Sequence, residues 1–147
     1  MKLLVVFPDP VAETIAVLRA RLTAEFPAVE FGTRDPMPPV QSRFGSPSYQ
    51  SEDTPPLPYV RVRLDGGHTR YPVLHTATIR LNAYARTEDQ SLELARVAQG
   101  ILLAFEGNAR VRSFSPVFGP ISTADPDRGA PLAFLTLTAR MRPQPLE

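Results

Sequence analysis

The stretch Tyr59–Ala85, YVRVRLDGGHTRYPVLHTATIRLNAYA, constrains the fold of this chain more than any other segment. Within Tyr59–Leu64 the side chains alternate, so that one face of the segment carries Val60, Val62 and Leu64 and the other carries Tyr59, Arg61 and Arg63. An alternation with period two predicts a half-buried β-strand. The residues Asp65-Gly66-Gly67 tolerate positive φ, and we therefore expect them to form the turn of a β-hairpin.

The second strand of this hairpin is predicted at Pro72–Ala85, with His75, Ala77, Ile79, Leu81 and Ala83 on one face. At about 3.3 Å per residue, a strand of this length would span roughly 46 Å, well beyond the usual five or six residues. Either a bulge bends the strand, or its first half projects beyond the fold together with the preceding strand. A projecting hairpin cannot bury its own surface, and we expect a neighbouring subunit to cover it.

Two amphipathic helices flank this hairpin in the sequence. The first begins at Asp9-Pro10, where a capping carboxylate precedes a proline at the first helical position, and it ends near Glu25. Its apolar stripe consists of Val11, Ile15, Leu18 and Leu22. Pro27 then stops the helix.

The second helix begins at Thr87, which forms a capping-box pattern with Gln90, and it ends at Gly107-Asn108. Its apolar stripe consists of Leu94, Val97, Ala98, Ile101, Leu102 and Phe105. Gly100 lies in the middle of this helix, where glycine costs about 1 kcal/mol relative to alanine. We therefore expect Gly100 to pack closely against a strand.

Three more strands are predicted at Ala28–Thr33, Arg110–Phe118 and Leu132–Arg142. Leu3–Phe7 is either a short strand or an extended arm. The turn-rich residues Gly119–Pro131 are expected to form a loop, and Pro143–Glu147 a short tail.

These elements predict one α+β domain over residues 1–147, in the order α-β-β-β-α-β-β. A mainly antiparallel sheet of four to five strands has two helices packed on one face. That apolar face carries Val60, Val62, Leu64, Ile79, Leu81, Leu135 and Leu137. The opposite face either contacts water, meets a partner or lines an opening, and it carries Arg61, Arg63, Thr76, Thr78, Arg80, Thr136, Thr138 and Arg140.

The segment Asp35–Pro58 interrupts this pattern, because it holds seven of the seventeen prolines of the chain. No periodic structure is compatible with that composition. We expect an excursion at one edge of the fold, which either becomes ordered against a partner or is a loop without a role.

The sequence indicates no catalytic or metal chemistry. The chain has no cysteine, which excludes disulfides, thiolate zinc sites and a cysteine nucleophile. His68 and His75 lack metal-binding spacing, and Asp125 and Asp127 are explained by a turn. The net charge of +1 gives no general attraction to nucleic acid or anionic membrane. We expect a protein made in the cytoplasm that is not an enzyme and binds no cofactor.

The chain resembles the tail terminator (tail completion, or minor tail) proteins of long-tailed bacteriophages and related prophages. The resemblance runs from about residue 3 to residue 143 and rests on LLVVFPDPVAETIAVLRARL, PYVRVRLDGG, TATIRLNAYARTEDQSLELARVAQGILLAF, GPISTADPDRGAP and AFLTLTARMRP. The segment Asp35–Pro58 is longer than this region usually is in that family.

The resemblance implies a virion protein that forms a ring, typically a hexamer, on the head-proximal end of the completed tail tube. Such a ring stops tube polymerisation and joins the tail to the head. It contacts the tail tube protein and the head–tail connector protein, and DNA passes through it without sequence-specific binding. The resemblance implies no catalytic step, cofactor or membrane association.

A ring of identical subunits uses heterologous contacts, in which two different surfaces of the subunit meet. The candidate assembly residues lie in the hairpin and in the proline-rich segment, and they are Arg61, Arg63, His68, Arg70, Tyr71, Leu74, Arg80, Phe44 and Tyr49. The alternative is a monomeric or dimeric α+β module that binds a small ligand or a nucleic-acid backbone.

Overall fold

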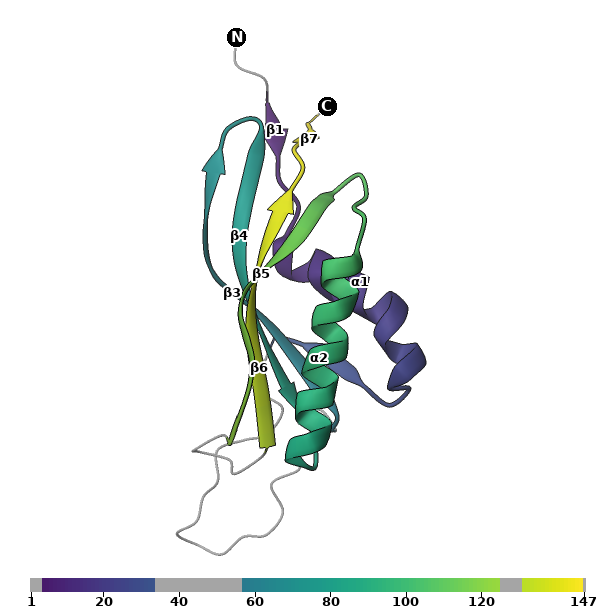
Figure 1. Ribbon diagram of the computed structural model, residues 1–147. Coiled ribbons are helices and arrows are strands. Elements are labelled where there is room, and N and C mark those ends of the chain that lie inside the picture. The colour runs from purple at the N-terminus through teal and green to yellow at the C-terminus, as the bar shows by residue number, and fades with distance from the viewer. Residues whose placement is uncertain (1–3, 34–56, 125–130, 147) are drawn as a thin grey trace, which may run out of the picture.

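The computed structural model describes residues 4–33, 57–124 and 131–146. Two helices and seven strands are present in these residues (Figure 1). The helices are α1 (Pro10–Glu25) and α2 (Glu88–Ala104). The strands are β1 (Val5–Val6), β2 (Glu30–Gly32), β3 (Tyr59–Arg70), β4 (Leu74–Tyr84), β5 (Val111–Ala124), β6 (Pro131–Met141) and β7 (Gln144–Pro145).

The main sheet has five strands in the order β2-β3-β4-β6-β5. All neighbouring pairs are antiparallel except β2 and β3, which are parallel. Figure 1 shows both helices on the same side of this sheet. The predicted α+β fold, with a mainly antiparallel sheet covered on one face by two helices, is confirmed.

The core lies between the helices and the covered face of the sheet. The predicted alternation is confirmed for Val60, Val62, Ile79, Leu81 and the facing residues of β6, which are almost fully inaccessible to solvent. Leu64, predicted on the same covered face, is instead 50% exposed. From α1 the core receives Leu18 and Leu22, and from α2 it receives Leu94, Ala98 and Leu102. The remaining stripe residues Val11, Ile15, Val97, Ile101 and Phe105 are partly buried against it.

Both helices begin where the sequence predicts. The Asp9 carboxylate accepts hydrogen bonds from the backbone amides of Val11, at 3.0 Å, and Ala12, at 3.4 Å. The Thr87 hydroxyl accepts one from the Gln90 amide at 3.2 Å. These bonds satisfy backbone donors that have no partner within the helix.

The predicted turn at Asp65-Gly66-Gly67 is wrong. The strand β3 continues through these residues to Arg70, and the chain reverses at residues 71–73. Asp65 is the extra residue of a β-bulge between Leu64 and Gly66. Gly66 has φ of 144°, which L side chains rarely adopt, and a Cβ on Gly67 would lie 2.5 Å from the Thr76 carbonyl oxygen. A bulge and a close strand approach, and not a turn, therefore require these two glycines.

The predicted loop at Gly119–Pro131 is also wrong where the structure describes it. The strand β5 runs on to Ala124, while residues 125–130, including Asp125 and Asp127, lie outside the described part. The pairing of β5 with β6 shifts register at three places, which obscures the alternation in the sequence. Gly119 has φ of 87°, and a Cβ there would lie 2.7 Å from the Phe134 carbonyl oxygen.

Two other expectations are corrected. Gly100 does not pack against a strand, because it is exposed and an added Cβ would meet no atom within 4 Å. The predicted tail, Pro143–Glu147, contains a strand: β7 pairs with β1 in a separate two-stranded ribbon. This pairing also answers the question left open for Leu3–Phe7, since Val5 and Val6 form a strand.

Candidate assembly surface

The β3–β4 hairpin divides into two parts at the bulge. The hairpin base comprises residues 59–64 and 79–84, and the hairpin arm comprises residues 65–78. In the base, Tyr59, Val60 and Val62 are buried. In the arm, every β3 residue from Asp65 to Arg70 is exposed. The arm therefore contributes little of its β3 strand to the core and leaves it available for contact.

The two strands of the arm differ in their surroundings. The strand β4 is covered along its length by β6, which pairs with it as far as His75. The strand β3 has β2 as its outer neighbour only at Tyr59–Arg61. From Val62 to Arg70, no other strand of the described residues pairs with the outer edge of β3. The structure has a bulge, but it lies in β3 at Asp65 and not in the second strand, where the sequence-based alternative places it. Only the β3 side of the arm is open.

The end of the arm contacts the two-stranded β1–β7 ribbon and the residues beside it. The Val5 amide donates a hydrogen bond to the Tyr71 hydroxyl at 3.0 Å. His75 Nδ1 lies 2.8 Å from the Thr69 hydroxyl, and the His75 ring lies 5.7 Å from that of Phe7. These contacts give His75 a structural role, and they hold the arm in a defined position.

Asp65, the bulged residue, lies between two arginines. Its carboxylate is 3.5 Å from Arg63 Nε and 3.0 Å from Arg80 Nε. The Arg80 Nε atom is inaccessible to solvent, and its short contact with Asp65 lacks the geometry of a hydrogen bond, so we treat it as an ion pair. The bulge thus places one negative charge between two positive charges on the sheet face that the helices leave uncovered.

Aromatic rings share this uncovered face with the charges. Tyr59 and Tyr84 lie 6.5 Å apart between ring centroids, and Phe118 and Phe134 lie 5.7 Å apart. The Arg80 guanidinium is 6.0 Å from the centre of the Phe134 ring, within the range of a cation–π contact. The face is therefore neither purely basic nor purely apolar.

Exposed large apolar side chains gather in two places. The arm end and the neighbouring β1–β7 ribbon carry five of them, and Figure 1 shows these elements at one end of the molecule. They are Leu4, Val6, Tyr71, Val73 and Leu146. Val117, Phe118 and Ile121 form the other group, on β5 at the opposite edge of the sheet. Exposed apolar patches of this kind mark protein–protein contact surfaces.

The predicted assembly residues have different positions. His68, Arg70 and Tyr71 are exposed on the arm, and Leu74 is half-buried there. Arg63 and Arg80 meet at Asp65. Arg61 belongs to the base, where its Nε donates to the Thr33 carbonyl oxygen at 3.0 Å. Phe44 and Tyr49 lie outside the described residues, as does the segment Asp35–Pro58 except for Leu57 and Pro58.

Sequence reasoning missed the apolar group on β5 and Val73 at the arm end. The sequence pattern predicts the end of a strand at Phe118 and a loop at Ile121, since Gly119-Pro120 is typical of irregular structure. The only available signal was the cluster of large apolar residues around that dipeptide, which is unusual for a solvated loop. Val73 was assigned to a strand interior because the turn had been placed too early.

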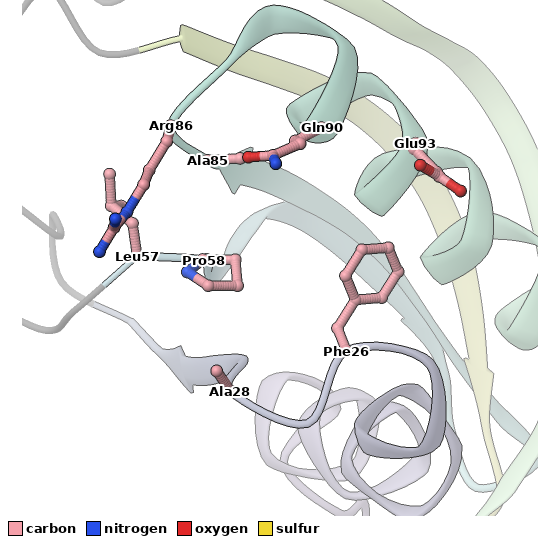
Figure 2. Close-up of a pocket in the computed structure, with 8 residues that line it drawn as sticks. All are labelled: Phe26, Ala28, Leu57, Pro58, Ala85, Arg86, Gln90 and Glu93. Carbon is pink, nitrogen blue, oxygen red and sulfur yellow. The ribbon is translucent and has the colours of Figure 1, made fainter.

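A pocket of about 440 Å³ lies apart from these surfaces (Figure 2). It is bordered by the end of α1, the start of β3 and the start of α2. Figure 2 shows the rings of Phe26 and Pro58 beside its opening, with Arg86 and Glu93 at its sides. Leu57, Ala28, Ala85 and Gln90 complete the lining.

Within residues 4–33, 57–124 and 131–146, no group of three or more histidine, cysteine, aspartate or glutamate side chains is placed to hold a metal ion. In the same residues, neither helix has both the length and the apolar character needed to cross a membrane.

A comparison of the chain with protein-family models found no matching family, and a search of curated proteins found no significant match.

Proposed function

We propose that this protein is a structural subunit of a bacteriophage-type tail, and that it forms a ring that terminates the tail tube. The proposal rests on the resemblance to tail terminator proteins together with one structural observation. The arm of the β3–β4 hairpin exposes its whole β3 strand and ends in an apolar patch, although Tyr59, Val60 and Val62 in the base of the same hairpin are buried.

The contacts that hold the arm in position support this proposal. A long exposed strand in a monomer is a site of uncontrolled pairing with other chains. Here the bulge at Asp65, the charges of Arg63 and Arg70 and the contact between Tyr71 and Val5 fix the arm and limit such pairing. A rigid exposed arm suits a specific contact with another subunit.

In the proposed ring, six subunits surround a channel through which DNA passes. One side of the ring contacts the tail tube protein, and the other contacts the head–tail connector protein. The protein then acts only by binding to other proteins and catalyses no reaction. Its place is in the virion, at the head-proximal end of the tail.

The oligomeric state of the purified full-length chain tests this proposal. Size-exclusion chromatography with multi-angle light scattering is expected to give a mass near six times 16.2 kDa. Negative-stain electron microscopy of that fraction is expected to show rings with a central opening. A monomer or dimer at every concentration, both alone and in the presence of tail tubes, would contradict the proposal.

The pocket supports a second candidate, a module that binds a small ligand. Its volume lies within the range of about 300–1,000 Å³ that is common for small-molecule sites. Phe26 and Pro58 offer apolar contact, and Arg86 offers a positive charge. An aromatic carboxylate is therefore a suitable probe. This candidate predicts a saturable rise in melting temperature with that probe, which the variant Arg86→Ala should lose.

A further inference from the structure

The two groups of exposed apolar residues lie at opposite edges of the main sheet. The strand order places β3 toward one edge and β5 at the other, with β4 and β6 between them. The arm carries Tyr71 and Val73, while β5 carries Val117 and Phe118. Within one chain the arm cannot reach β5, because two paired strands separate them. Contact between these surfaces therefore requires two copies of the chain.

The charges beside the two surfaces are complementary. The arm end carries the exposed Arg70, and Asp65 farther along the arm is already paired with arginines. Near β5 lies the acidic start of α2, where Glu88 Oε1 accepts a hydrogen bond from the Ser122 hydroxyl at 3.1 Å. Asp89, which follows it, is exposed. Complementary charges of this kind favour one docking orientation over others.

From these observations we infer that the hairpin arm of one copy docks against the β5 edge of the next copy. Tyr71 and Val73 contact the apolar group Val117, Phe118 and Ile121, and Arg70 faces Glu88 and Asp89. This inference rests on the proposed ring and specifies its subunit contact.

Such a contact is heterologous, because the surface that each copy gives differs from the surface that it receives. An open chain of subunits retains one unused arm at one end and one unused β5 edge at the other until it closes on itself. A two-fold contact between two arms would instead stop at a dimer. The two geometries therefore predict different products when subunits are linked covalently.

The absence of cysteine from the sequence allows a direct cross-linking test. Val73 is 63% exposed and Val117 is 58% exposed, so thiols at both positions are accessible to a short bis-maleimide. In the double variant Val73→Cys/Val117→Cys, we expect a ladder of covalent products that extends beyond the dimer. Either single variant alone should remain at the monomer position, and an equal mixture of the two should give dimers and nothing larger.

A matched control places the second thiol near the C-terminal end of α2, away from the Glu88 and Asp89 end that the proposed contact uses. Leu103 is 39% exposed there, and the variant Val73→Cys/Leu103→Cys is expected to give no ladder. Circular dichroism and melting temperatures compared with the parent chain verify that all variants fold.

Four results would overturn the inference. Dimers from Val73→Cys alone or from Val117→Cys alone indicate a two-fold contact. A ladder from the Leu103 control that equals that of the double variant indicates cross-linking without specificity. Rings by light scattering without any ladder leave the proposed function in place and assign the subunit contact to other surfaces. A monomer without a ladder, both alone and in the presence of tail tubes, removes both.

Discussion

The base and the arm of the β3–β4 hairpin are built from the same two strands but differ in what covers them. Leu64 and Ile79 face each other across the strands at the boundary, yet Leu64 is 50% exposed and Ile79 is fully buried. The backbone ladder continues past this point on both strands. The comparison teaches that pairing alone does not decide whether a strand stabilises the fold. Burial against the helices decides it, and the β3 strand of the arm remains exposed.

The largest expected effect on the free energy of unfolding comes from replacing Leu64 and Ile79 with alanine, one at a time. Ile79→Ala should lower the free energy of unfolding by about 2–5 kcal/mol, because it leaves a cavity in the core. Leu64→Ala should change it by no more than about 0.5 kcal/mol, as is usual at exposed positions. Urea denaturation followed by circular dichroism measures both. Equal losses from the two variants would show that the difference in burial between Leu64 and Ile79 has no effect on stability.

A second test destabilises only the arm and compares the hydrogen exchange of the arm with that of the base. In Gly67→Ala the new Cβ would clash with the Thr76 carbonyl oxygen, and relief of that overlap should cost about 1–3 kcal/mol. We expect hydrogen exchange to become faster for amides of the arm while those of the base, such as Val62 and Leu81, remain protected. Faster exchange throughout the sheet would show that arm and base unfold as one unit.

Gly100→Ala is the matched glycine control outside the hairpin. An added Cβ there meets open space within a regular helix, so the variant should stabilise the protein by about 1 kcal/mol. Thermal denaturation should show a higher melting temperature with no change in oligomeric mass. A destabilised Gly100→Ala protein would indicate that this face of α2 is covered in the assembly.

The smallest expected effect on stability belongs to the charges at the bulge. Asp65→Asn removes the carboxylate between Arg63 and Arg80, whose side chains are 44% and 42% exposed, so solvent screening keeps the loss within about 1 kcal/mol. The difference from the parent chain should shrink further in 1 M NaCl. A loss of several kcal/mol that resists salt would place Asp65 in the structural base instead of the arm.

The sequence was sufficient to predict the elements that local chemistry determines. The capping residues Asp9 and Thr87 and the apolar stripes predicted where both helices begin and which sides they bury. Alternation likewise predicted the covered and uncovered faces of β3, β4 and β6. These signals are local because caps and periodicity act over a few residues.

Long-range pairing explains what the sequence did not predict. Asp65-Gly66-Gly67 suits a turn and a bulge equally well, since both need glycine at unusual φ or at a close approach. The pairing of β4 with β6 as far as His75 helps to determine the outcome by extending the sheet past the bulge. The β5 part of the candidate surface was missed for a similar reason, because its register shifts against β6 hide the alternation.

The most direct test of the arm as an assembly surface replaces residues Tyr71–Val73 with an Asn-Gly turn. Arg70 and Leu74 face each other across the strands, so a two-residue turn can join them without altering the base. Light scattering of this variant should show loss of the ring, while circular dichroism and urea denaturation remain near those of the parent chain. A ring of unchanged mass and yield would contradict the claim that the hairpin arm joins one subunit to the next.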